Sequence, residues 1–285
     1  MQKFDLHMHT KYCDGNNSAE EMVRAAIDRG LDTVGISGHS FTPHDTSYCM
    51  SEEGTQQYIA EIEDLKVRYK DQIRILLGIE RDYYARLEND PFDYVIGSLH
   101  YFFKGEDWTD VDADAYSQRK FAVKHFGSDM TSLAELYYET VGGIVSATDC
   151  DIIGHFDLIT KFNERFALDS EGNVVDVWNA DAAGDVKPLF DTESGRYKAA
   201  WMKAVDRIFE ETAARSRTNR LETLGIIEAG SKPVFEINTG AISRGYRKTP
   251  YPAPDQIEYI RSKGGLFIMS SDSHSTGAIG FGFED

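Results

Sequence analysis

The chain has 285 residues, of which 41% are hydrophobic and 27% are charged, as in a globular protein that is long enough to bury a full core. Its formal net charge of −18 argues against nucleic acid as a partner, because duplex binding needs clustered Lys and Arg. Three cysteines predict no disulfide framework and therefore a reducing, cytoplasmic setting, and no apolar run is long enough to predict a membrane span.

Seven short apolar segments alternate with helical segments along the chain. The predicted strands are residues 4–9, 33–37, 73–80, 94–100, 152–156, 234–238 and 266–270. Several are nearly continuous apolar runs, as expected for parallel strands that are buried on both faces. The predicted helices begin near Ser18, Ser51, Thr131, Lys198 and Pro254. This alternation predicts a parallel sheet, and seven strands are expected to close into a barrel.

Residues 162–197 interrupt the alternation. They contain the turn-forming sequences SEGN, AAGD and ESGR and no clear long helix. A connection of this length usually carries a function or forms a small subdomain. We therefore interpret residues 1–285 as a single barrel domain, with an insertion at about 162–197 above the mouth of the barrel.

Six of the eight histidines lie at or just beyond the C-terminal end of a predicted strand: His7, His9, His39, His100, His155 and His274. Glu80 ends the third strand, and Asp272 lies two residues before His274. In an α/β barrel these strand ends converge on one face, where active sites lie. A single histidine at such a position is usually an ordinary polar residue. Six of them, together with carboxylates, predict a metal site that suits Zn, Mn or Fe.

This set of residues resembles the polymerase and histidinol phosphatase (PHP) family, over almost the whole chain. Within that family the sequence is most similar to the histidinol-phosphate phosphatases, through the segments HFDLITK, EINTGAISRGYRKTPYP and SSDSH. The resemblance implies a distorted (β/α)7 barrel, similar to a TIM barrel, with up to three divalent metal ions at the strand ends.

The resemblance also assigns ligands to each of the three ions. The first ion is expected to bind His7, His9, Glu80 and Asp272. The second is expected to share Glu80 as a bridge and to add His100 and His155. The third is expected to bind His39 and His274, with Asp14 as its carboxylate, although DGNNS is also an ordinary turn sequence.

Two or more close metal ions suit the hydrolysis of a phosphate ester. A hydroxide held between two ions is available near neutral pH, because metal binding lowers the pKa of water from about 15.7 to about 7. It is expected to attack phosphorus in line, so Glu80 and Asp272 become catalytic through the ions they hold. The ions also explain how an acidic chain accepts a small phosphorylated substrate.

Basic residues beyond two strand ends are candidates for binding the phosphate. Lys161 follows the fifth strand, and Arg244 and Arg247 follow the sixth. Each alone resembles a solvated surface cation, but together, in strand-end loops, they indicate phosphate binding. The family often has arginine where Lys161 stands, and lysine lacks the two-pronged guanidinium.

Two further polar residues have open roles. His44, in HSFTPHD, is either a proton donor or substrate contact, or an ordinary loop histidine. Asn238 ends the sixth strand, the one strand without a predicted ligand. It either orients the substrate or neighbouring groups, or marks a turn.

Three functions are compatible with these features. The first is hydrolysis of L-histidinol phosphate in histidine biosynthesis. The second keeps the barrel but acts on a nucleotide or another small phosphate ester. The third is a noncatalytic metal-binding barrel, against which the complete ligand set argues. No membrane or nucleic-acid partner and no particular oligomeric state is predicted.

Overall fold

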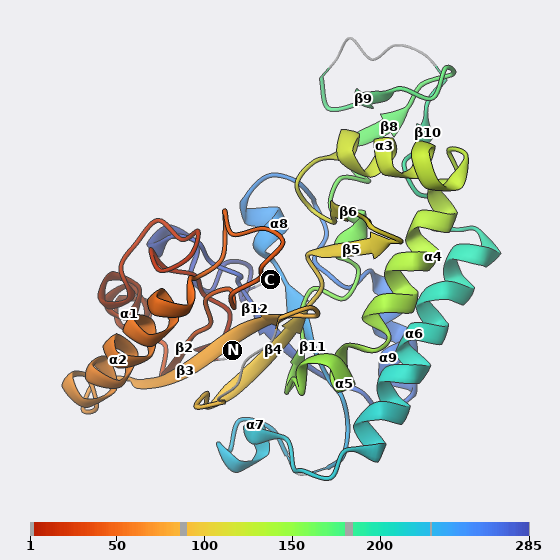
Figure 1. Ribbon diagram of the computed structural model, residues 1–285. Helices are drawn as coiled ribbons and strands as arrows, with labels where there is room; N and C mark the ends of the chain where they lie inside the picture. The colour runs from red at the N-terminus through yellow and green to blue at the C-terminus, as the bar shows by residue number, and fades with distance from the viewer. Residues whose placement is uncertain (1–2, 86–89, 180–184, 229, 285) are drawn as a thin grey trace.

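A computed structural model describes residues 3–85, 90–179, 185–228 and 230–284. Its main sheet has seven parallel strands in the order β1-β2-β3-β4-β7-β11-β12 (Figure 1). They are β1 (Phe4–Asp5), β2 (Thr33–Ile36), β3 (Arg74–Asp82), β4 (Tyr94–Ser98), β7 (Ile152–Ile153), β11 (Val234–Asn238) and β12 (Leu266–Ser270). Every predicted strand is present, although the first, second, fourth and fifth are shorter than expected.

The first and last strands meet and bring the sheet close to a closed barrel. β1 pairs regularly with β2 only over Phe4–Asp5. Beyond it, Met8 accepts a hydrogen bond from the backbone N–H of Ser37 on one side and forms a parallel bridge with Ser273 on the other. The nearly closed seven-stranded barrel confirms the predicted (β/α)7 fold.

The interior of the barrel below the strand ends is apolar. It is filled by Leu6, Leu76, Tyr94, Ile96, Ile152, Val234 and Ile268. The Tyr94 hydroxyl donates to the backbone oxygen of Leu6 at 2.5 Å. A Cβ atom at Gly35 of β2 or Gly78 of β3 would lie 2.1 or 2.3 Å from Tyr94, so this aromatic side chain, which comes from β4, needs glycine at both positions. The apolar side chains named above form what we call the apolar plug. The polar groups lie beyond this plug, at the C-terminal end of the barrel.

Helices cover the outside of the barrel. They are α1 (Ala19–Asp28), α2 (Glu52–Arg68), α3 (Ala115–Phe126), α4 (Met130–Val141), α5 (Ile144–Thr148), α6 (Gly195–Ala214), α7 (Arg220–Thr223), α8 (Gly240–Ser243) and α9 (Pro254–Ser262). The predicted capping box at Ser18 is present, and Ser51 caps α2. Asp129 and Ser194 cap α4 and α6, which therefore begin slightly earlier than predicted. None of the helices in the described ranges has both the length and the apolar character needed to cross a membrane.

Two small antiparallel sheets were not predicted. β5 (Tyr101–Lys104) and β6 (Asp107–Asp110) form a hairpin just beyond β4. β8 (Phe166–Leu168), β9 (Val174–Asp176) and β10 (Lys187–Pro188) form a sheet that stands apart from the barrel in Figure 1. This second sheet falls within residues 162–197, and α6 begins at Gly195. The insertion and the single-domain division stay predictions.

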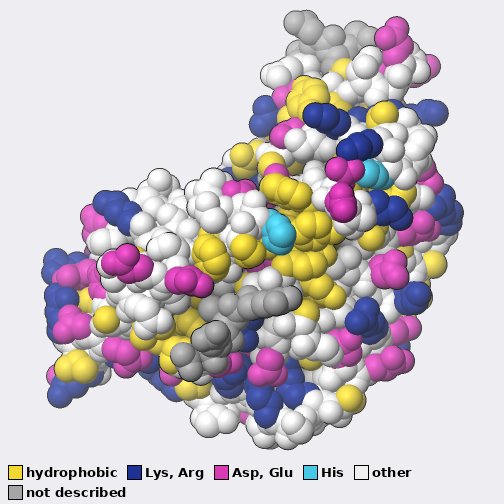
Figure 2. Space-filling view, in the orientation of Figure 1, with side chains coloured by type: hydrophobic (Ala, Val, Ile, Leu, Met, Phe, Trp, Pro, Cys, Tyr) yellow, Lys and Arg dark blue, Asp and Glu magenta, His cyan; other side chains and the backbone are white. Residues whose placement is uncertain are grey.

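Figure 2 shows one face of the molecule, on which Lys and Arg side chains are interspersed with Asp and Glu.

Candidate metal centre

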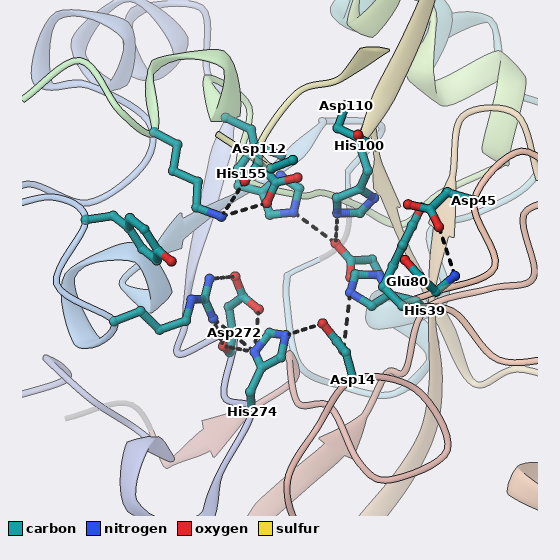
Figure 3. A pocket seen from close by; sticks show the side chains of 17 residues that line it. Asp14, His39, Asp45, Glu80, His100, Asp110, Asp112, His155, Asp272 and His274 are labelled. Atoms are coloured by element: carbon teal, nitrogen blue, oxygen red, sulfur yellow. Dashed lines mark hydrogen bonds and ion pairs between the residues drawn. The ribbon is translucent and has the colours of Figure 1, made fainter. Parts of the chain in front are cut away.

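The strand ends bring the predicted ligands into one cluster, of which Figure 3 shows the members that line a cavity, among them Glu80, His100 and Asp272. Three groups have ligand atoms within 4.8 Å of one another: His9, Asp14, His39 and His274; His7, His9 and Glu80; and His39, Glu80 and His100. His155 and Asp272 join them through short contacts, since His155 Nε2 lies 2.9 Å from a Glu80 oxygen and Asp272 Oδ1 lies 3.3 Å from His9 Nε2. All nine predicted ligands therefore lie together.

Glu80 occupies the middle of the cluster and is almost completely buried. Its Oε1 accepts a hydrogen bond from the Ser98 hydroxyl at 2.7 Å and lies 2.9 Å from His155 Nε2. Its Oε2 lies 2.9 Å from His39 Nδ1. The two oxygens thus face different sets of histidines, which is the arrangement that a bridging carboxylate requires.

Asp272 is held in an uncommon backbone conformation. Its φ angle is +48°, in the left-handed region that residues other than glycine rarely adopt. One carboxylate oxygen faces His9, and the other lies 3.0 Å from Arg244 Nη2. A Cβ atom at Gly240 would lie 2.8 Å from the Asp272 side chain, so α8 begins close against this residue. Such backbone strain is concentrated at functional sites.

The cluster has the donor atoms of a cation site. Among the described residues, His7 Nε2, His9 Nε2 and Glu80 Oε2 are buried and form no hydrogen bond with suitable angles. The 2.9 Å approach of Oε2 to His39 Nδ1 is therefore a close contact only. Oε2 lies 3.3 Å from the His7 nitrogen and 3.5 Å from the His9 nitrogen. An unsatisfied buried polar atom costs about 1–3 kcal/mol. A divalent ion that accepts imidazole and carboxylate ligands would satisfy all three atoms at once.

The electrostatics also suit a metal ion. Burial by itself raises the pKa of Glu80, but the nearby His39 and His7 outweigh it and hold the pKa well below its usual range. Burial lowers the pKa of His9 to about 3, and repulsion from His274 and His39 adds to the effect. The carboxylate is therefore ionised and His9 is neutral, which are the protonation states that bind a metal. Glu80 and other nearby carboxylates outweigh burial at His7 and His100 and raise the pKa of both, so a metal ion would displace a proton from each of these rings when it binds.

A carboxylate to which the sequence analysis assigned no role, the first residue of the segment EINTGAISRGYRKTPYP, also contacts the ligands. Glu236 Oε1 lies 2.5 Å from His7 Nδ1, and its Oε2 accepts a hydrogen bond from the backbone N–H of His155 at 2.7 Å. Glu236 belongs to β11, the strand expected to carry no ligand. The available signal was a single charged residue in the otherwise uncharged strand VFEIN.

A cavity of about 350 Å³ opens over the cluster. Two predicted phosphate-binding residues, Lys161 and Arg244, line it together with the ligands. Lys161 Nζ donates to the Asp112 carboxylate at 2.9 Å, and Arg244 Nη1 lies 2.9 Å from His274 Nδ1. Asp45 and Asp110 line the same cavity. The cavity therefore offers both metal ligands and protein cations to an anionic group.

Arg247 does not line this cavity, contrary to the prediction. Its guanidinium is buried, donates to the Thr160 hydroxyl at 2.7 Å and lies 4.3 Å from the centre of the Tyr251 ring. The buried carboxylate of Asp157, 3.7 Å away, together with Glu164 attracts the side chain away from the cluster. Arg247 is thus placed to balance a buried acid.

His44 and Asn238 also lie outside the cavity lining. His44 is exposed, and its ring packs at 4.8 Å against Phe103 of β5. Asn238 is buried, and its amide donates to Glu236 Oε2 at 3.1 Å and to Asp272 Oδ2 at 3.4 Å. Asn238 therefore contacts one carboxylate of the cluster and one carboxylate beside it, and its role in binding substrate stays a prediction.

A nearly closed (β/α)7 barrel with histidines and carboxylates at the strand ends defines a class of metal-binding barrel proteins. The family model of the PHP domain matches residues 5–192 of this chain, which is more than half of it. The chain belongs to the PHP domain family.

Individual relatives agree with this assignment. A Deinococcus radiodurans protein named "Probable histidinol-phosphatase" is 26% identical over 99% of this chain and 90% of its own length. A Listeria monocytogenes structure assigned as a histidinol phosphatase matches with a TM-score of 0.73 at 19% identity, over 99% of both chains. The Lactococcus lactis histidinol phosphate phosphatase, solved with zinc, L-histidinol and phosphate, matches with a TM-score of 0.61 at 18% identity, over 96% of this chain and 87% of that one. These two structural likenesses establish the fold.

Proposed function

We propose that this chain is a metal-dependent phosphomonoesterase that hydrolyses L-histidinol phosphate to L-histidinol and phosphate. The observation that carries the proposal is the single cavity in which Glu80 and its histidines face Lys161 and Arg244. The names of the relatives, and the ligands of the Lactococcus lactis structure, support the choice of substrate.

Each group in the cavity has a proposed task. Divalent ions, when bound, would activate water at neutral pH and neutralise phosphoryl charge. Glu80, Asp272 and the histidines would hold these ions. Lys161 and Arg244 would hold the phosphoryl oxygens, and Asp112 would orient Lys161 through their 2.9 Å contact. We assign no role to His44, since its ring packs outside the cavity.

The finer details of the metal site stay predictions. They are the number of ions, their identity as Zn, Mn or Fe, the ligands of each, and the attack by a bridging hydroxide. The proposed ligand sets are supported by the three groups of ligand atoms around Glu80 and His9. Glu80, His9 and His39 each belong to two of these groups, and of the three only the Glu80 carboxylate has two anionic oxygens with which to bridge two ions.

The nearest alternative is the same chemistry on a nucleotide or another small phosphate ester. Phosphate release should therefore be measured with metal-loaded protein on histidinol phosphate, AMP and a 3′,5′-bisphosphate. We expect the highest kcat/KM on histidinol phosphate. A higher value on AMP or the bisphosphate would support the alternative substrate class.

The third function, a noncatalytic barrel, is tested by the same panel combined with a metal count. We expect two to three equivalents of transition metal in purified protein, loss of activity with a chelator, and recovery with Zn or Mn. Fully loaded protein that releases no phosphate from any substrate would favour the noncatalytic function. Full activity in metal-free protein would contradict the proposal altogether.

A further inference from the structure

Glu236 is a fully buried charge inside the barrel. In β11 it follows Val234 by two residues, so both side chains lie on the inner face of the strand. Val234 belongs to the apolar plug, and Glu236 lies one layer nearer to the strand ends. Burying a carboxylate in such a place is costly unless it is paired and hydrogen-bonded. Its contacts should therefore explain its presence.

The two oxygens of Glu236 have different partners. Oε2 accepts hydrogen bonds from the backbone N–H of His155 at 2.7 Å and from the Asn238 amide at 3.1 Å. Oε1 faces Nδ1 of His7 at 2.5 Å. An ionised carboxylate only accepts hydrogen bonds, so the shared proton of the last contact belongs on Nδ1 of the ring.

A proton on Nδ1 determines what the other ring nitrogen can do. His7 Nε2 points away from Glu236, toward Glu80 Oε2 at 3.3 Å and Asp272 Oδ1 at 3.8 Å. This is the nitrogen that is buried without a hydrogen-bond partner. With Nδ1 protonated, a neutral His7 presents the lone pair of Nε2 to the cluster.

We propose that Glu236 is a positioning residue of the metal centre, which fixes His7 as the Nδ1–H tautomer with Nε2 directed at the ions. The same carboxylate ties His7, beyond β1, to the backbone of His155, beyond β7. It thus sets the spacing between ligands from two strands that are not neighbours in the sheet. Hydrogen bonds of this kind orient ligating histidines, and their loss typically costs about 10- to 100-fold in metal affinity. The inference rests on the proposed metal sites and is independent of the substrate.

The variant Glu236→Gln removes the charge and keeps the shape of the side chain. Its amide cannot accept from His7 on one side and from His155 and Asn238 on the other, because one end is now a donor. We expect the affinity for Zn, measured by competition with a chromophoric chelator, to fall about 10- to 100-fold. The thermal midpoint of the metal-free protein should change less than in the control variant.

The control is Asp151→Asn, another buried carboxylate that accepts a backbone hydrogen bond. Asp151 precedes β7 at the opposite end of the barrel, where it accepts from Val95 N–H at 3.0 Å and pairs with Arg217. A purely structural role for Glu236 predicts that both variants lose stability and keep Zn affinity. Unchanged Zn affinity in Glu236→Gln would therefore overturn the proposal.

A measurement on the unmodified protein avoids dependence on the folding of any variant. ¹⁵N NMR of histidine-labelled, Zn-loaded protein distinguishes the two tautomers of each ring, and we expect His7 to be protonated at Nδ1. Protonation at Nε2 would also overturn the proposal. If the wild-type protein binds no Zn, the proposed function fails; if it binds Zn and Glu236→Gln binds it equally well, only this inference fails.

Discussion

Oε1 of Glu80 lies 2.9 Å from Nε2 of His155, although the two residues come from different strand ends of the barrel. The opposite oxygen of Glu80 faces His39 at the same distance. A glutamine cannot offer two anionic oxygens, so Glu80→Gln should lose bound metal as well as turnover. Metal content by mass spectrometry and kcat on histidinol phosphate test this expectation. The control is Glu164→Gln, at a half-buried position outside the cavity, which should change neither metal content nor kcat. If Glu80→Gln keeps both ions and turns over at a near-normal rate, Glu80 is not a metal ligand.

Lys161 and Arg247 should behave differently, because only Lys161 lines the cavity. Lys161→Ala should lower kcat/KM about 10- to 100-fold and leave the metal content unchanged. A charge-assisted hydrogen bond is worth about 1.5–3 kcal/mol, and each loss of about 1.36 kcal/mol in transition-state stabilisation lowers the rate tenfold. Arg247→Ala should mainly lower the thermal midpoint, because it leaves the buried Asp157 without its cation. Steady-state kinetics and thermal unfolding of both variants test whether Lys161 acts on the substrate and Arg247 on stability. Wild-type kcat/KM in Lys161→Ala would place the phosphate elsewhere.

Asp110 should make stability depend on pH. Burial and the negative charges of Asp45 and Asp112 raise its pKa from the usual 3.8 to about 6. The folded state then holds the proton more tightly than the unfolded state, so stability falls as pH rises from about 4 to about 6 and the loss persists above that range. In metal-free protein, Asp110→Asn should therefore raise the thermal midpoint at pH 8 and leave it unchanged near pH 3.5.

The same hairpin provides a control of opposite sign. Asp107 is bonded to Lys124 at 2.6 Å, which lowers the pKa of that carboxyl. Asp107→Asn should lower the midpoint, if it changes it at all, at pH 8 rather than raise it. An Asp110→Asn midpoint that shifts equally at both pH values would show that the effect is not due to ionisation.

Gly35 should be intolerant of any side chain. A Cβ atom there would lie 2.1 Å from the Tyr94 hydroxyl inside the barrel, and overpacking of this kind typically costs about 1–3 kcal/mol. Gly35→Ala should show that loss in chemical denaturation. Gly195→Ala, at the first residue of α6 with no atom within 4 Å of the new Cβ, should be neutral or slightly stabilising. Equal stability of the two variants would mean that the interior around Tyr94 is less tightly packed than described.

The strand framework and the clustering of the candidate ligands were predictable for a common reason. Apolar runs mark buried parallel strands, and the candidate ligands lie where those runs end, so Glu80 and His155 were expected to lie on the same face without knowledge of the fold in detail. The direction of a loop side chain depends instead on partners that are remote in sequence. Arg247 turns toward Asp157, and His44 packs on Phe103, for reasons that no local pattern contains.

Glu236 was overlooked for a related reason. Glu236 opens the quoted segment EINTGAISRGYRKTPYP, but the segment does not state its role, which depends on the atoms that the carboxylate contacts across the barrel. A charged residue within an apolar strand is a usable signal, but only when the interior-facing position is known. The β5–β6 hairpin was hidden similarly, because its first strand follows β4 after two residues.

His274 Nε2 lies 3.1 Å from Asp14 Oδ2, although the two residues are 260 positions apart in the chain. During translation, the segment that carries Asp14 therefore leaves the ribosome long before its partner exists. Contacts between residues so far apart in sequence slow folding. Until the last strands have been synthesised, the early strands form a sheet with an unpaired edge. We expect the nascent chain to depend on chaperones until β12 emerges, and to complete the metal sites that use Asp272 and His274 only after that point.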